Sequence, residues 1–305
     1  MSPPDFLIIG AQKSGTTWLD RNLRLHPDVW LPPEKELHFF DFPPVMPFFF
    51  LRLAPVRGIR HWARYRMQRD ARIAAGSPTL AGWYRRYYWM PRTESWYRRN
   101  FAPTAGQLAG EATPRYAVIG ERRRAQLKRL APRVKLIYLL RDPIDRMWSD
   151  LALFNSAKFG GSGIVGHTES RWLEFLLHPT NLAHSRYDEN LLHWAASFGA
   201  DRIHLAFYDD IASQPEALIN GVCRFLGLDP SRFDHSRLLR ERIHSHPYPE
   251  IPTSIARVLS ERLLPDLQHL HGRLQHPHTA RWLARAEHLI HPQSSKTGAS
   301  SHEQT

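Results

Sequence analysis

Short apolar runs alternate with amphipathic segments along most of the chain. The run Phe6–Ile9 is branched, apolar and bounded by glycine, which is typical of a buried strand. Comparable runs at 134–140 and 201–210 predict further strands. Segments 121–130 and 216–226 have the spacing of helices. The pattern predicts an α/β fold in which helices flank a central parallel sheet.

A polar turn follows the first predicted strand and leads into a helix. The turn and the start of the helix comprise Gly10, Ala11, Gln12, Lys13, Ser14, Gly15, Thr16, Thr17 and Trp18. A strand, a small-residue turn and a helix together aim backbone N–H groups and a positive helix end at one anion. The turn therefore predicts a phosphate site. A turn that only caps the helix is the alternative.

The turn differs from the phosphate loop of nucleoside triphosphatases. The pattern GxxxxGK[ST], begun at Gly10, requires lysine at position 16, where this chain has Thr16. The lysine of this turn is Lys13, which precedes Gly15. A lysine inside the turn adds nothing to helix capping, so we favour the anion-binding role.

Length and charge narrow the class of protein. The chain has 305 residues, enough for one large α/β domain with an insertion. Its 41 Lys and Arg against 29 Asp and Glu give a net charge of +12, which suits anionic partners without choosing among them. The one cysteine, Cys223, excludes an internal disulfide and a cysteine-based metal site. Without a recognisable signal peptide or membrane-spanning run, we expect a cytoplasmic protein.

A second polar segment, at 32–41, combines charged and aromatic residues. Lys35, Glu36 and His38 lie beside the aromatic pair Phe39–Phe40. A charged loop anchored by aromatic residues suits acid–base chemistry, and a solvated run of charges is the alternative. His38 is a candidate base because the ordinary pKa of histidine is close to neutral.

The segment at 43–93 is unusually rich in arginine and aromatic residues. Arginines recur there at near-helical spacing, followed by aromatic residues at 83–89; the arginines are Arg57, Arg60, Arg64, Arg66, Arg69 and Arg72. A basic amphipathic helix beside aromatic residues is compatible with an anionic membrane surface or an acidic glycan. Single-stranded nucleic acid also fits such a pattern. A lid whose aromatic residues pack on the sheet is an equal alternative.

A second candidate anion site follows the strand at 134–140. Arg141, Asp142 and Pro143 come directly after it, and Ser149 follows in the next predicted helix. Open α/β sheets bind ligands beyond the carboxyl ends of their strands, and arginine offers a two-pronged grip on phosphate. Alternatively, Pro143 begins a helix and Arg141 pairs with a surface acid.

These segments together resemble sulfotransferases that use 3′-phosphoadenosine-5′-phosphosulfate (PAPS), in particular the carbohydrate-type and bacterial enzymes. The turn with Lys13 resembles their 5′-phosphosulfate loop, the segment 35–41 their second motif, and Arg141 with Ser149 their 3′-phosphate motif. The resemblance covers most of 5–41 and 105–230. It implies a three-layer, P-loop NTPase-like α/β fold.

The resemblance also implies site residues. The co-substrate PAPS would be bound by Lys13, Ser14, Gly15, Thr16, Thr17, Trp18, Arg141, Ser149 and Arg242. On resemblance we prefer Glu36 to His38 as the base that accepts the acceptor's proton, with Lys35 and Lys13 near the sulfuryl group. No metal is implied. Some carbohydrate enzymes have a lysine where this chain has Ala112.

We therefore predict a sulfotransferase domain at 1–292 with an insertion at about 43–93 and a disordered tail at 293–305. PAPS and its product PAP are the expected ligands. The expected acceptor is a hydroxyl or amine of a glycan or glycolipid, although a lipid or a small-molecule alcohol also fits. Peripheral contact with an anionic membrane is compatible with the insertion, whereas nucleic acid is not expected. The alternatives are a variant P-loop nucleotide kinase and a non-catalytic anion- or membrane-binding module.

Overall fold

The computed structural model describes residues 3–42, 57–159, 168–239 and 249–292. The chain divides into two compact units, which we describe separately. The first unit comprises residues 1–11, 15–139 and 193–243, and the second comprises 12–14, 140–192 and 244–305. The single domain at 1–292 stays a prediction, and the tail at 293–305 lies outside the described residues.

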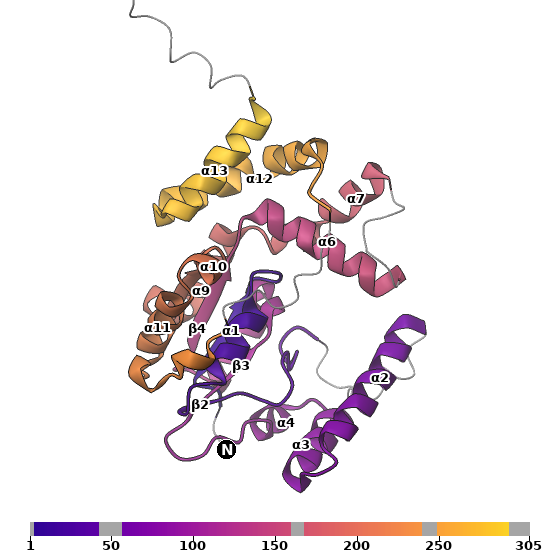
Figure 1. Ribbon diagram of the computed structural model, residues 1–305, viewed down its shortest axis with the longest axis vertical. Helices are drawn as coiled ribbons and strands as arrows, with labels where there is room; N and C mark the ends of the chain where they lie inside the picture. The colour runs from indigo at the N-terminus through magenta and orange to yellow at the C-terminus, as the bar shows by residue number, and fades with distance from the viewer. Residues whose placement is uncertain (1–2, 43–56, 160–167, 240–248, 293–305) are drawn as a thin grey trace, which may run out of the picture. The chain divides into compact units, whose positions relative to one another are not determined.

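The first unit is built on a five-stranded sheet in the order β2-β3-β1-β4-β5 (Figure 1). The strands are β1 (Phe6–Gly10), β2 (Val29–Trp30), β3 (Leu108–Ala112), β4 (Lys135–Leu140) and β5 (Ile203–Phe207). β1 pairs in parallel with both β3 and β4, and β2 pairs in parallel with β3. The predicted central parallel sheet is confirmed.

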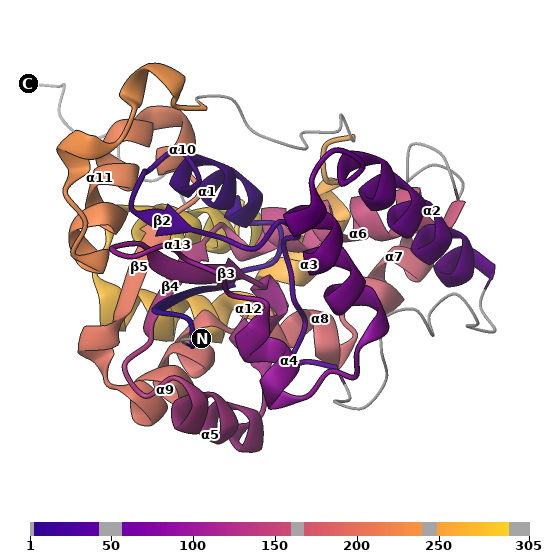
Figure 2. The ribbon, with the colours of Figure 1, turned by 90° about the horizontal axis from the view of Figure 1, so that it is seen from below.

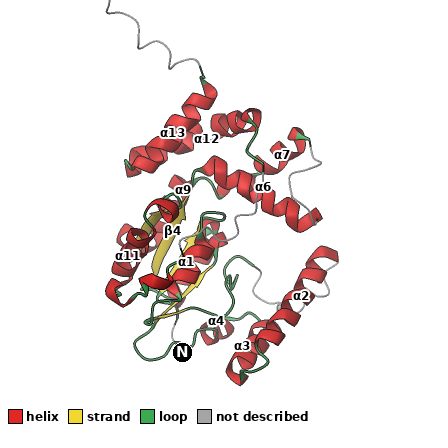
Figure 3. Cartoon of the chain, viewed as in Figure 1, coloured by secondary structure: helices red, strands yellow, loops and turns green. Residues whose placement is uncertain are grey.

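Helices cover both faces of this sheet (Figures 2 and 3). Side chains alternate across a strand, so Phe6 and Ile8 share one face. They pack there against α1 (Thr16–Leu23) and α11 (Pro215–Leu226), in a cluster that includes the buried Cys223. The opposite face is covered by α5 (Glu121–Leu130) and the end of α9 (Tyr187–Phe198). Both faces are therefore apolar, as parallel strands require.

Further helices of the first unit lie between β2 and β3, directly after β3 and around β5. They are α2 (Arg57–Ile73), α3 (Pro78–Trp89), α4 (Glu94–Arg99) and α10 (Asp210–Ser213), with short 3₁₀ helices at Pro114–Val118, Ala200–Arg202, Pro230–Arg232 and His235–Arg237. α2 and α3 account for the described part of the predicted insertion. Its residues 43–56 lie outside the described part of the chain.

The second unit is helical. It contains α6 (Pro143–Phe159), α7 (Glu169–Leu176), α8 (Pro179–Ala183), α12 (Thr253–Leu274) and α13 (Pro277–Ile290), and α9 begins in it. α12 and α13 pack against each other. Three buried residues of α12 recur at helical spacing, namely Leu263, Leu267 and Leu270. Trp282 of α13 is buried as well.

The strand order reverses at β1, because the chain moves from β1 to β2 on one side and reaches β4 on the other. Ligands of open α/β sheets bind beyond the carboxyl ends of the strands at such a reversal. The turn after β1 and the residues after β4 both start from these ends. The two segments with anion-binding patterns therefore follow the strand ends beyond which ligands bind in folds of this class.

Candidate active site

The turn after β1 contains two left-handed residues. Lys13 has a φ of 65° and Gly15 a φ of 85°. Alternation of left- and right-handed residues turns successive backbone N–H groups toward one concave face, which suits an anion. α1 begins directly afterwards at Thr16, and the first N–H groups of a helix have no acceptor within the helix. The N–H groups of Thr16 and Thr17 are therefore available to an anion.

Gly15 is required by both conformation and space. Its φ lies in the left-handed region, which residues with a Cβ adopt at a cost. A Cβ at this position would lie 2.3 Å from Cδ1 of Ile211 and 3.1 Å from Cδ2 of Tyr208. Side chains are thus packed against the glycine, and a larger residue would shift the start of α1.

Arg141 connects the two predicted anion motifs. Its Nη1 donates a hydrogen bond to the backbone carbonyl of Lys13 at 3.0 Å. The hydroxyl of Tyr187 in turn donates to the backbone carbonyl of Arg141 at 2.9 Å. Burial raises the pKa of Tyr187 to about 12 despite the nearby charge of Arg146, so this hydroxyl stays a donor at neutral pH. Ser149 is buried in α6, two turns after the helix begins.

Asp142 caps α6 and joins it to α13. Its Oδ1 accepts the backbone N–H of Ile144 at 2.9 Å, and Pro143 occupies the first helical position. Arg285 Nη1 donates to Asp142 at 2.6 Å and to Asp145 at 2.9 Å. Burial and the charge of Asp145 raise the pKa of Asp142 to about 6, against the opposing effect of Arg285. The Arg-Asp-Pro segment is thus also a helix start.

The side chain of Trp18, one of the predicted nucleotide contacts, faces away from the turn after β1. The side chain of Trp18 is buried in the core beside β1, and its indole N–H donates to the carbonyl of Leu239. Trp18 can therefore offer a nucleotide only its backbone N–H. Arg242 lies outside the described residues.

Lys35, Glu36 and His38 converge in the loop after β2. Lys35 Nζ lies 2.8 Å from Oε1 of Glu36, and His38 Nε2 lies 3.2 Å from the other carboxylate oxygen. The second ring nitrogen of His38 lies 2.8 Å from Oδ2 of Asp41. The backbone N–H of Glu36 donates to the carbonyl of Ala112 at the carboxyl end of β3. The three predicted catalytic residues of this loop therefore form one group.

Charge and burial shift the pKa values of Glu36 and His38 in opposite directions. Burial by itself would raise the pKa of Glu36, but the charge of Lys35 and the hydrogen bond from His38 hold that pKa well below its ordinary range. Burial would likewise lower the pKa of His38, but hydrogen bonds with Asp41 and Glu36 raise it above its ordinary value. Glu36 is therefore a carboxylate at neutral pH, and His38 favours its protonated form.

A buried carboxyl group lies under this loop. Oε1 of Glu111 accepts the hydroxyl of Tyr97 at 2.5 Å, and Oε2 accepts that of Thr113 at 3.0 Å. Tyr116 also hydrogen-bonds to Glu111, and its hydroxyl accepts the backbone N–H of Phe39 at 2.9 Å. Burial raises the pKa of Glu111 to about 7, although the hydroxyl groups oppose the rise. The network links β3 to the loop that carries Glu36.

Arginines of the insertion pair with two buried carboxylates, Glu34 before the insertion and Asp70 within it. Glu34 is buried and accepts Arg66, Arg69 at 2.8 Å and the hydroxyl of Tyr84 at 3.1 Å. Asp70, fully buried, accepts Arg69 and Tyr88. The aromatic residues of α3 that are buried are Trp83, Tyr84, Tyr87 and Tyr88. These aromatic rings pack against one another, whereas Arg64 and Tyr65 on α2 are exposed.

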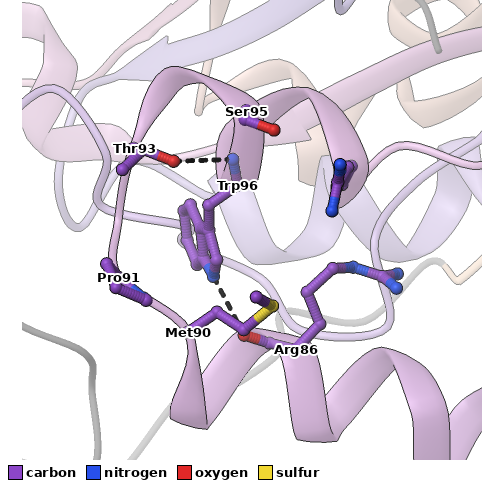
Figure 4. Close-up of a pocket in the computed structure, with 7 residues that line it drawn as sticks. Arg86, Met90, Pro91, Thr93, Ser95 and Trp96 are labelled. Atoms are coloured by element: carbon purple, nitrogen blue, oxygen red, sulfur yellow. Dashed lines mark hydrogen bonds between the residues drawn. The ribbon is translucent and has the colours of Figure 1, made fainter.

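A small pocket lies between the end of α3 and α4 (Figure 4). It is lined by Arg86, Met90, Pro91, Thr93, Ser95, Trp96 and Arg99. Trp96 is held at this pocket by two hydrogen bonds, since its indole N–H donates to the carbonyl of Arg86 at 3.1 Å and its backbone N–H to Thr93 Oγ1 at 3.1 Å. Its ring stacks on Phe39, with the ring centroids 6.2 Å apart.

Two structural features are absent from the described residues. No group of three or more His, Cys, Asp or Glu side chains is arranged to hold a metal ion there. Within the same residues, no helix combines the length and the apolar character needed to cross a membrane.

Comparison with known proteins identifies the family. The model of the sulfotransferase domain matches residues 3–246, which is well over half of the chain. The chain belongs to the sulfotransferase family. Membership confirms the resemblance drawn from the motifs.

Curated relatives agree with this family. Human heparan sulfate glucosamine 3-O-sulfotransferase 6 is 30% identical over 232 residues, covering 74% of this chain and 52% of the relative. The membrane-associated sulfotransferase kil1 of Dictyostelium discoideum is 23% identical over 329 residues, covering 80% of this chain and 59% of the relative. The chain thus spans between half and three fifths of the length of these two relatives.

Solved structures share the fold. A sulfotransferase from Alicyclobacillus acidocaldarius superposes with a TM-score of 0.64 at 22% identity, covering 92% of this chain and 99% of the other. A sulfotransferase domain from the curacin biosynthetic pathway gives a TM-score of 0.51 at 17% identity, covering 85% and 98%. The predicted P-loop-like α/β fold of this sulfotransferase is confirmed.

Several residues that support the candidate site have no predicted role in the sequence motifs. Asp41 stands three residues after His38, a spacing that could have suggested their pairing. Arg92 donates to the carbonyl of His38 from 54 residues away, and no local pattern announces that contact. Tyr187 lies 46 residues after Arg141, and its contact is likewise invisible in the sequence.

Proposed function

We propose that this sulfotransferase moves the sulfuryl group of PAPS to a hydroxyl or amine of an acceptor and releases PAP. The observation that carries the proposal is the hydrogen bond from Arg141 to the carbonyl of Lys13. It joins the turn after β1 to the segment after β4, the two segments with anion-binding patterns. A donor with phosphate groups at both its 5′ and 3′ positions requires two such segments at one place.

The turn after β1 would hold the 5′-phosphosulfate. Its concave backbone, the ammonium group of Lys13 and the N–H groups of α1 stabilise negative charge that grows on the phosphate as it leaves. Arg141 and Ser149 would hold the 3′-phosphate, and the buried contacts of Asp142 and Tyr187 fix the segment that carries Arg141.

In the transfer itself, the acceptor oxygen or nitrogen forms a bond to sulfur while the bond between sulfur and the phosphate oxygen breaks. The acceptor's proton passes to the carboxylate of Glu36, and PAP leaves with the electron pair of the broken bond. Glu36 is ionised at neutral pH, as a base must be. Lys35, 2.8 Å from Glu36, adds positive charge to this group. Most of the rate would come from positioning and electrostatics.

The proposed acceptor is a glycan or glycolipid. Support comes from the relatives whose names specify heparan sulfate glucosamine and from the cationic residues exposed on α2. Ala112 replaces a lysine of some carbohydrate enzymes, so Lys13 and Lys35 remain as cations for the transfer site. Transfer of labelled sulfate into a cell extract, followed by enzymatic digestion of glycans and separation of lipids, tests this choice.

We also propose peripheral contact with an anionic membrane through the exposed Tyr65, Ile73 and Trp89 of the insertion, beside its arginines. Co-sedimentation with vesicles of anionic and neutral phospholipids tests it. Binding to neutral vesicles alone, or to neither, would contradict it. The cytoplasmic location stays a prediction.

The donor proposal is tested by titration calorimetry and transfer assays. We expect binding of PAP in preference to ATP, without added divalent metal. Lys13→Ala should abolish most transfer, whereas Arg64→Ala, on the exposed face of α2, should leave PAP binding unchanged. Preference for ATP, or PAP affinity unaffected by Arg141→Ala, would refute the proposal.

A further inference from the structure

The backbone of the loop that carries Glu36 is strained. Glu36 has a φ of 68° and His38 a φ of 54°, and neither residue is a glycine. A residue with a Cβ is disfavoured in this conformation, because the Cβ approaches the following carbonyl oxygen. Such conformations persist only where the surroundings hold them, and they cluster at functional sites. Some part of the structure must therefore hold this loop.

Arg92 is placed to hold it. Its side chain is buried, with 7% of the residue exposed. Nη2 donates to the backbone carbonyl of Leu37 and, at 2.9 Å, to that of His38. The guanidinium group therefore bonds to the carbonyl of Leu37, which lies between the two left-handed residues, and to the carbonyl of the second of them, His38.

Arg92 itself is fixed by an aromatic platform. Its guanidinium carbon lies 5.4 Å from the ring centroid of Trp96, a cation–π contact. Trp96 is in turn held by its hydrogen bonds to Arg86 and Thr93, as Figure 4 shows. The platform therefore leaves Arg92 little freedom to adopt another rotamer.

The insertion holds the loop from its other end as well. Glu34, two residues before Glu36, is gripped by Arg66 and Arg69 of α2 and by Tyr84 of α3. The segment from Glu34 to His38 is thus fixed on both sides of Glu36 by residues that lie between β2 and β3 in the sequence. The ion pairs of α2 with Glu34 consequently restrain the loop of the proposed base.

We propose that Arg92 is a positioning residue, which holds the loop of Glu36 and His38 in its left-handed conformation and so aims the Glu36 carboxylate for proton transfer. The inference rests on the proposed role of Glu36 as the base. Arg92 acts through the backbone carbonyls and does not itself touch the reacting atoms. Lysine could retain the charge over Trp96 but not the planar fork of the guanidinium group.

The test compares Arg92→Leu, Arg92→Lys and the control Arg85→Gln, which changes an exposed arginine of α3. We expect Arg92→Leu to lower kcat by roughly 100-fold, the order of loss that misplacement by about 1 Å causes. Arg92→Lys should recover part of this loss, and both variants should bind PAP within about twofold of the wild type. Amide exchange at 36–39 should accelerate in both variants and not in Arg85→Gln.

Unchanged kcat and unchanged exchange in Arg92→Lys and Arg92→Leu would overturn the inference. If Arg92→Leu does not fold, Arg92→Lys decides alone: reduced kcat with faster exchange supports positioning, and wild-type values of both contradict it. Glu36→Gln separates this inference from the proposed function. If that variant keeps full transfer, Glu36 is not the base, while the exchange data still report whether Arg92 holds the loop.

Discussion

The imidazole of His38 lies against the carboxylate of Glu36, with Nε2 3.2 Å from Oε2. Its other ring nitrogen faces Asp41 at 2.8 Å. An imidazole between two carboxylates donates from both nitrogens, which favours its protonated form. In this arrangement His38 is a hydrogen-bond donor to Glu36, and so it supports a carboxylate base instead of competing with it.

The pH dependence of transfer should show whether Glu36 is the base and His38 its hydrogen-bond donor. Because the pKa of Glu36 is held below its ordinary range, we expect kcat to be nearly flat between about pH 5 and 7, with its acid limb at lower pH. His38→Gln removes the charged partner, so the acid limb should move to higher pH. A wild-type rate that instead climbs through a pKa above 6.5, and loses that climb in His38→Gln, would make His38 the base.

Arg141 and Ser149 should discriminate donors by their 3′-phosphate. Arg141→Ala should lower the affinity for PAP by at least roughly tenfold, since a charge-assisted hydrogen bond contributes about 1.5–3 kcal/mol. The affinity for adenosine 5′-monophosphate, which has no 3′-phosphate, should fall far less. Calorimetry with both ligands measures the ratio. Equal losses for the two would show that Arg141 acts on the turn after β1 and not on the 3′ position.

Gly15 and Gly82 form a matched pair of glycine substitutions. Gly15→Ala should destabilise the protein by at least about 1–2 kcal/mol, because Ala at this position adopts the left-handed region and its Cβ meets Ile211. Gly82→Ala, in α3 with nothing within 4 Å of the added Cβ, should stabilise by about 0.5–1 kcal/mol. Denaturant unfolding measures both. A neutral Gly15→Ala would contradict the packing described for this turn.

Glu111 should make stability depend on pH. Folding raises its pKa to about 7, so the folded state retains a proton that the unfolded chain releases near pH 4.5. The free energy of unfolding therefore falls as pH rises from about 4.5 to 7, by an amount on the order of 3 kcal/mol. In Glu111→Gln the loss should vanish, and the Tm difference from wild type should grow across this window. The exposed Glu121, changed to Gln, is the control, and a constant difference would refute the assignment.

Elements with a local periodic signal could be predicted closely. The helix expected at 121–130 is α5, Glu121–Leu130, and the strand expected at 134–140 is β4, Lys135–Leu140. Alternation and helical spacing depend only on neighbouring residues, so a single sequence contains them. The positions of the turn after β1 and of the segment after β4 could be predicted for the same reason, because each is a contiguous run beside a strand. Anion binding by these segments stays a prediction.

Long-range pairing could not be predicted. Arg66 belongs to a basic helical pattern that indicated an anionic partner, yet it binds Glu34, 32 residues earlier. Trp18 follows the phosphate turn in sequence, but the helical rotation of α1 directs its indole into the core. In both cases the position of a side chain depends on tertiary packing, which outweighs the local pattern.

The ion pair of Arg285 with Asp142 crosses the boundary of the family match. The match ends at residue 246, but the carboxylate that begins α6, next to Arg141, has its cationic partner in α13. A fragment cut at the end of the match would retain every motif of the proposed PAPS site and still leave Asp142 and Asp145 without that counter-charge. For expression and crystallisation, the usable limits of the protein therefore extend through α13, well past the residues by which its family is recognised.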